Sequence, residues 1–76
     1  MSDVVDQLTE MWNELLEPTQ ITPDSDFFDC GGTSVTAVYL AAAVQESLGV
    51  ALDAIEVVKL RTFGAIAQTL SERLGA

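Results

Sequence analysis

A long loop turns into a helix through the stretch Asp26-Phe27-Phe28-Asp29-Cys30-Gly31-Gly32-Thr33-Ser34-Val35. Two successive glycines let the backbone turn sharply, because glycine has no Cβ to restrict its dihedral angles. Ser34 follows the turn and is a good N-cap for a predicted helix over 34–48, which Gly49 would end. Its hydroxyl would be exposed where free amides and the helix dipole favour an anion such as phosphate. The same spacing also fits an ordinary N-cap, and the lysine of a phosphate-binding P-loop is missing.

The predicted helix 34–48 is apolar on two sides, and Glu46 is its only ionised residue. A surface helix needs one apolar face, which packs on the core. The second face is either covered by the preceding loop or offered to a partner. At 100° per residue, the core face contains Ala37, Leu40, Ala41, Val44 and Leu48, and the second face contains Val35, Val38, Tyr39 and Ala42.

The first 33 residues read as a helix followed by a long loop. The helix spans about 3–16, with Ser2 or Asp3 as its cap and Pro18 just beyond its end. Residues 17–33 have no helical or strand period, and loops of this length are often functional, although a well-packed connector would look the same. The expected core residues of the helix are Val4, Val5, Leu8, Met11, Trp12, Leu15 and Leu16, and those of the loop are Ile21, Phe27 and Phe28.

Two more helices are predicted after Gly49. A short one spans 53–60, where Asp53 and Glu56 have the spacing of a capping box. The last begins after Thr62, a candidate cap, and ends at Gly75. The fold class is therefore all-α, a four-helix bundle with three longer helices and a short third one. The short helix has more apolar residues than its core-facing side alone can hold: Ile55, Val57, Val58 and Leu60. The apolar stripe of the last helix consists of Phe63, Ile66, Ala67, Leu70 and Leu74.

Composition excludes several functions. The chain has 76 residues, which is room for one small domain, and 12 acidic against 3 basic residues give a net charge of −9. Nucleic acids and anionic membranes would repel such a protein, whereas a partner with a basic face would be attracted. No apolar run reaches the length of a membrane span and the N-terminus does not read as a signal peptide. We therefore expect a cytoplasmic monomer.

The residues needed for catalysis or metal binding are also missing. The sequence has no histidine and one cysteine, Cys30, so it offers no zinc ligand set, no internal disulfide and no Ser–His–Asp relay. Residues 24–35 fail as a calcium loop, because Asp29 stands where glycine is needed and Val35 where glutamate is needed. Without a suitable general base the chain is not expected to be an enzyme. Cys30 is interpreted as a small, partly buried apolar residue.

The stretch 26–35 resembles the core motif of peptidyl carrier proteins, the thiolation domains of nonribosomal peptide synthesis within the acyl carrier protein family. That motif has two phenylalanines, two further residues, two glycines, any residue and then serine. Thr33 replaces the usual histidine, aspartate or asparagine, Val35 replaces leucine, and Cys30 replaces leucine or isoleucine. The likeness continues in Leu8-x-x-Met11-Trp12-x-x-Leu15-Leu16, in Leu48-Gly49-Val50-x-Leu52 and in Arg61-Thr62-Phe63-Gly64-x-Ile66-Ala67.

This resemblance implies a non-catalytic bundle of the acyl carrier type. In the family, the serine that matches Ser34 receives 4'-phosphopantetheine from coenzyme A through a magnesium-dependent phosphopantetheinyl transferase. The arm then holds an aminoacyl or acyl group as a thioester. An adenylating or acyl-transferring enzyme loads it, and a downstream synthase or tailoring enzyme receives the cargo. The nearly neutral helix 34–48 and the two-glycine motif favour a peptidyl carrier of secondary metabolism, acting in nonribosomal peptide or hybrid polyketide biosynthesis.

The resemblance also implies a docking surface on the second and third helices beside the arm. Lys59 and Arg61, two of the three basic residues, lie close together in sequence and could either meet an acid on a partner or relieve local repulsion. The expected contact residues are Thr33, Val35, Val38, Tyr39, Ala42, Val57 and Val58.

Two questions stay open from the sequence. Met1 and an end just past the last helix suggest a free-standing carrier domain over 1–76, although an excised domain with an added start would look the same. The alternative function is a small acidic module that is never modified and binds a partner through the second apolar face. Modification of Ser34 separates these two hypotheses.

Overall fold

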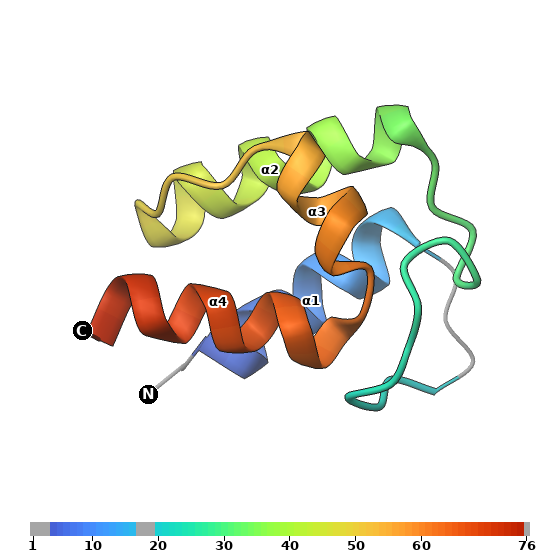
Figure 1. Cartoon of the computed structure of the whole chain (residues 1–76), viewed down its shortest axis with the longest axis horizontal. Helices are drawn as coiled ribbons and strands as arrows, with labels where there is room; N and C mark the ends of the chain where they lie inside the picture. Colours follow the sequence, from blue (N-terminus) through green and yellow to red (C-terminus); the bar gives the residue numbers. More distant parts are fainter. Residues whose placement is uncertain (1–3, 17–19, 76) are drawn as a thin grey trace.

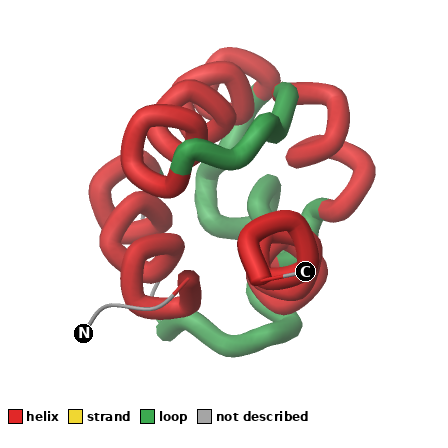
Figure 2. The backbone as a smooth tube through the Cα atoms, turned by 90° about the vertical axis from the view of Figure 1, so that its left-hand side faces the viewer, coloured by secondary structure: helices red, strands yellow, loops and turns green. Residues whose placement is uncertain are grey.

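The computed structural model describes residues 4–16 and 20–75, and these form four helices (Figure 1). The helices are α1 (Val4–Leu15), α2 (Ser34–Leu48), α3 (Ala54–Leu60) and α4 (Phe63–Gly75). Both α1 and α3 pack against α2 and against α4, so that the helices surround one shared interior (Figure 2). The predicted all-α architecture with a short third helix is confirmed. The expected caps Ser2 and Asp3 and the helix stop Pro18 lie outside the described residues.

The core is centred on the single tryptophan. The Trp12 ring has no exposed surface and makes edge-to-face contacts with Phe27 and Phe63, with ring centroids 5.9 and 5.3 Å apart. These three rings join α1, the long loop and α4, and edge-to-face aromatic pairs add to the gain from burial. Phe27 is therefore the loop anchor that was predicted, while Ile21 and Phe28 pack partly buried against the same core.

Two predicted core residues are exposed. Val5 is 46% exposed and Leu74 is 45% exposed. Each lies in an end turn of its helix, where less of the bundle covers the apolar stripe. The periodicity gave the correct side of α1 and α4 but overstated how far along each helix the core extends.

A second contact ties the long loop to the connection between α3 and α4. The Asp26 carboxylate forms an ion pair with Arg61 (3.1 Å) and also accepts the amide of Phe28 (2.8 Å). The Arg61 guanidinium lies over the Phe28 ring, 5.3 Å from its centroid. The Phe27 amide donates to the Arg61 carbonyl (2.7 Å), and an isolated antiparallel bridge joins Asp26 to Thr62. Arg61 is therefore paired within the chain.

At the opposite end of α3, Arg73 fastens this short helix to α4. Its guanidinium donates to the Ala51 carbonyl (2.6 Å) and to both carboxylate oxygens of Glu56. Asp53 caps α3 by accepting the Glu56 amide (2.8 Å). The Glu56 side chain binds Arg73 instead of returning to Asp53, so the cap forms without the reciprocal half of a capping box. The hydrogen bond from Arg73 holds the pKa of Glu56 below its ordinary value.

Replacing Glu56 with glutamine tests this ion pair. A carboxylate whose pKa is lowered by folding stabilises the fold above its unfolded pKa, and the stabilisation is lost as pH falls through the folded pKa. We expect Glu56→Gln to lose less stability than the parent between pH 7 and pH 3, measured as the urea midpoint. Salt should shrink the difference because the pair is exposed. Glu46→Gln, on exposed surface of α2, is the control; equal pH dependence in parent and Glu56→Gln would contradict the assignment.

Substitutions at two neighbouring residues test which face of α2 packs on the core. Leu40 is 1% exposed and Tyr39 is 59% exposed. We expect Leu40→Ala to lower the free energy of unfolding by about 2–5 kcal/mol, because it leaves a cavity in the core. Tyr39→Ala should change it by less than about 0.5 kcal/mol. Urea unfolding measures both, and a larger loss for Tyr39→Ala would mean that the faces are reversed.

Candidate functional site

Ser34 is the first residue of α2, and the preceding residue caps the helix. Thr33 has the extended backbone of an N-cap (φ −132°, ψ 176°), and its hydroxyl accepts the Thr36 amide (3.2 Å). The prediction that Ser34 is the N-cap is therefore wrong by one residue. Both residues have a hydroxyl, and the backbone conformation decides which one caps. As a consequence, the exposed Ser34 hydroxyl has no hydrogen-bond partner among the described residues.

The double-glycine turn sets where Ser34 emerges. Gly31 has φ +94°, a conformation that side chains disfavour. Gly32 lies so close to Phe27 that an added Cβ would be 2.6 Å from the Phe27 carbonyl oxygen. That same carbonyl accepts the Gly32 amide (3.0 Å). The turn is thus locked onto a buried aromatic residue, and α2 starts from a fixed point.

The start of α2 is suited to a negatively charged group. Its first turn contains no acidic residue, and the amides of Ser34 and Val35 have no acceptor in the described part of the chain. Free amides and the helix dipole together favour an anion here. The Ser34 oxygen is therefore a suitable attachment point for a phosphate ester.

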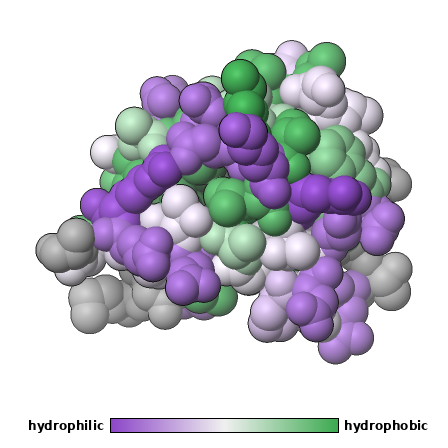
Figure 3. All heavy atoms as spheres, in the orientation of Figure 1, coloured by the Kyte–Doolittle hydropathy of each residue, from purple (hydrophilic) through white to green (hydrophobic). Residues whose placement is uncertain are grey.

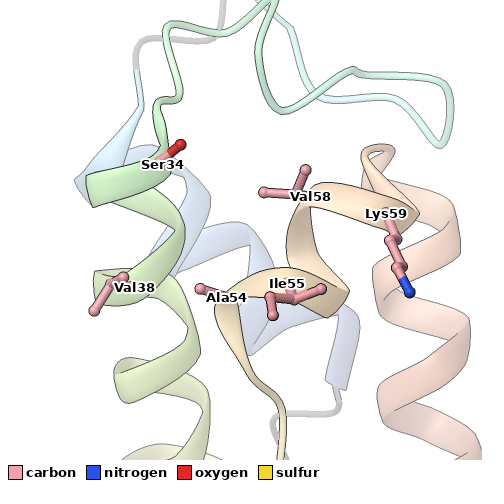
Figure 4. Close-up of a pocket in the computed structure, with 6 residues that line it drawn as sticks. All are labelled: Ser34, Val38, Ala54, Ile55, Val58 and Lys59. Carbon is pink, nitrogen blue, oxygen red and sulfur yellow. The ribbon is translucent and has the colours of Figure 1, made fainter.

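An apolar groove begins at Ser34 and runs between α2 and α3. Figure 4 shows the Ser34 hydroxyl pointing towards the space between the two helices, with side chains of α3 opposite. The groove has a volume of about 400 Å³. Its lining residues are Ser34, Val38, Ala54, Ile55, Val58 and Lys59.

The second apolar face of α2 is exposed and is not covered by the loop. Val35 is 63% exposed, Val38 56% and Tyr39 59%, and Thr33 and Ala42 are also exposed. Val58 is half-buried and lines the groove. Figure 3 shows hydrophobic residues gathered over α2 and the neighbouring α3. Most of the expected contact residues therefore share one surface.

The expectation for Val57 is wrong, and Ile55 was missed. Val57 has no exposed surface and belongs to the core, so it cannot contact a partner while the bundle is folded. Ile55 is 66% exposed and lines the groove. Ile55, Val58 and Lys59 are spaced three and four residues apart, so they share the outer side of α3. The excess of apolar residues in α3 was the available signal, but seven residues are too few for periodicity to separate the two sides.

Cys30, the other residue considered from the sequence, does not form a second site with the described residues. Cys30 is half-buried and packs against the core, which agrees with its interpretation as a small apolar residue. Among the described residues, none of the helices has the length and hydropathy that a membrane span requires.

Comparison with known proteins identifies the family. Residues 6–70 match the family described as "Phosphopantetheine attachment site", and the chain belongs to this family. It is 37% identical over 71 residues to the hybrid PKS-NRPS synthetase apdA of Emericella nidulans, covering 88% of this chain and 2% of that protein. It is 35% identical over 72 residues to N-(5-amino-5-carboxypentanoyl)-L-cysteinyl-D-valine synthase of Amycolatopsis lactamdurans, covering 92% and 2%. The chain thus spans about 2% of the length of these relatives.

This membership confirms the predicted family and cofactor. Proteins of the family carry 4'-phosphopantetheine as a covalently attached prosthetic group, and such a carrier domain is not catalytic in itself. The chain is therefore a phosphopantetheine-dependent carrier domain with the all-α acyl carrier fold. The residues at the start of α2 fit the group: an unbonded hydroxyl, two free amides for its phosphate and an apolar groove beside its attachment point.

Replacing Gly32 with alanine tests the lock between the turn and Phe27. We expect Gly32→Ala to cost about 1–3 kcal/mol of stability, because the added Cβ must displace a buried ring or its backbone. Gly75→Ala is the matched control, since a Cβ there would meet nothing within 4 Å. Thermal unfolding of the three proteins measures the effect. A melting temperature of Gly32→Ala equal to that of the parent would show that the turn is not locked.

Proposed function

We propose that Ser34 is the residue that carries 4'-phosphopantetheine. The observation that supports this most strongly is its exposed hydroxyl, which has no partner among the described residues and stands at the start of α2 beside the apolar groove. Ser47 and Ser71 are also exposed, but they lie at or near the C-terminal ends of α2 and α4, where the helix dipole disfavours a phosphate. Of the serines that the structure describes, only Ser34 combines a free hydroxyl with a favourable electrostatic position.

In this proposal Ser34 is the nucleophile and the chain supplies no base. The Ser34 oxygen forms a new bond to the phosphorus that bears the pantetheine arm in coenzyme A, the bond from that phosphorus to the rest of coenzyme A breaks, and the nucleotide part leaves. The hydroxyl proton passes to a base of the phosphopantetheinyl transferase, because the chain has no histidine and Ser34 has no acid–base partner among the described residues. The free amides at the start of α2 would then bind the phosphodiester.

The attached arm ends in a thiol, which holds an aminoacyl or acyl group as a thioester. The names of the relatives support a role in nonribosomal peptide or hybrid polyketide biosynthesis. The partners are then the transferase, an adenylating or acyl-transferring loading enzyme, and a downstream synthase or tailoring enzyme. A tether raises the effective concentration of cargo at each of these enzymes. We place the carrier, as one monomeric domain over 1–76, in the cytoplasm with them.

The enzymes are proposed to dock on the exposed apolar face next to the arm. This docking face is defined by Thr33, Val35, Val38, Tyr39 and Ala42 of the α2 side and by Ile55 and Val58 of α3. An exposed apolar surface on a small acidic protein is typical of a binding site. The same surface also favours the alternative function, an unmodified interaction module.

Intact-protein mass spectrometry decides between these functions. The protein is incubated with coenzyme A, magnesium and a broad-specificity phosphopantetheinyl transferase. We expect the parent and Ser47→Ala to gain the mass of one phosphopantetheine and Ser34→Ala to gain none. Ser47 is the matched control because it is an exposed serine of the same helix.

Two other results would change the conclusion. A gain in Ser34→Ala would place the attachment elsewhere in the chain. No gain in folded parent protein, as judged by its helical circular dichroism, would favour the unmodified interaction module.

A further inference from the structure

The chain has three basic residues, and two of them are used inside the fold. Arg61 pairs with Asp26, and Arg73 pairs with Glu56. Lys59 forms no hydrogen bond and no ion pair with any residue that the structure describes. In a protein with a net charge of −9, Lys59 is therefore the one basic residue that no ion pair engages within the described residues.

Lys59 lies at the edge of the groove. It lines the groove together with Ile55, which precedes it by one helical turn on the outer side of α3. Figure 4 shows its amino group on the side of α3 away from Ser34. The ammonium is thus separated from the start of α2 by the apolar side chains of Ile55 and Val58.

The nearest acidic residues in sequence on α3 and α2 form no ion pair with Lys59. Glu56 is three residues before Lys59. Arg73 binds both of its carboxylate oxygens and is the main cause of its lowered pKa, to which the charge of Lys59 contributes less. On the α2 side, the helix contains no charged residue before Glu46, which lies more than two turns beyond Val38. The groove is therefore an apolar channel with one positive edge on an otherwise acidic molecule.

We infer that the partner enzyme presents to this groove an apolar side chain followed, about one helical turn away, by an aspartate or glutamate that binds Lys59. The apolar side chain fills the space between Val38 and Ile55, and the carboxylate meets the ammonium. The overall negative charge still attracts a basic partner from a distance, but contact at the α3 edge requires an acid. The inference rests on the proposed function, in which enzymes dock on this face.

Three helical peptides provide the probe. Each presents two leucines one turn apart, followed one turn later by aspartate, asparagine or lysine, and the rest of the sequence is the same. They are titrated into ¹⁵N-labelled protein at physiological salt, where charges more than about 8 Å apart are largely screened. Amide shifts of the groove residues on α2 and α3 report binding at this site. We expect the aspartate peptide to bind about three- to tenfold more tightly than the lysine peptide, as for an exposed ion pair against a like-charge contact.

Variants of the protein assign the preference to Lys59. Lys59→Met should abolish the advantage of the aspartate peptide, and Lys59→Arg should retain it. Gln68→Glu is the matched control: it makes the net charge more negative by the same one unit as Lys59→Met, but at an exposed position on α4. It should leave the preference unchanged.

Three results would overturn the inference: equal or tighter binding of the lysine peptide, an aspartate preference that survives Lys59→Met, or no shift of the groove amides with any peptide. The mass measurement on Ser34 is independent of all three. An aspartate preference without modification of Ser34 would reject the carrier site but keep the interface. Modification of Ser34 together with tighter binding of the lysine peptide would keep the carrier site but reject the proposed interface.

Discussion

The insertion of Phe27 into the core is the contact on which the rest of the structure depends. Its ring packs edge-to-face on Trp12, its amide is held by the Arg61 carbonyl, and its own carbonyl accepts the amide of Gly32. One residue thereby joins α1, the α3–α4 connection and the turn that leads into α2. Without it, the turn into α2 would lose its anchor in the core, and the position of Ser34 relative to α3 would be less closely fixed.

Helix α2 has to satisfy two demands with almost no charged residues. One face contributes Ala37, Leu40, Ala41 and Val44 to the core, while the opposite face leaves three large apolar side chains more than half exposed. A polar outer face would be the usual arrangement for a surface helix. The exposed apolar face works against solubility, and the acidic residues elsewhere in the chain offset this.

The sequence predicted α2 well because its signals are local. The turn glycines, the cap region and Gly49 lie within the helix or next to it, and the observed bounds match the predicted 34–48. Features that depend on distant residues could not be predicted in this way. The pairing of Arg61 with Asp26 joins positions far apart in sequence, and the burial of Val57 depends on how α3 sits against α2 and α4. The family and its cofactor were predicted from the motif, whereas the attachment at Ser34 itself stays a prediction.

The cap of α2 and the hydroxyl proposed for modification belong to two adjacent residues, Thr33 and Ser34. If one serine did both tasks, turning its hydroxyl into an ester would remove the proton and alter the oxygen that the helix start relies on. Here Thr33 supplies the oxygen that accepts the Thr36 amide, so an ester on Ser34 would not remove that hydrogen bond. Maturation of the carrier would then leave the cap of α2 in place: the chain can reach its final shape first, present a finished surface to the modifying enzyme and keep that shape afterwards.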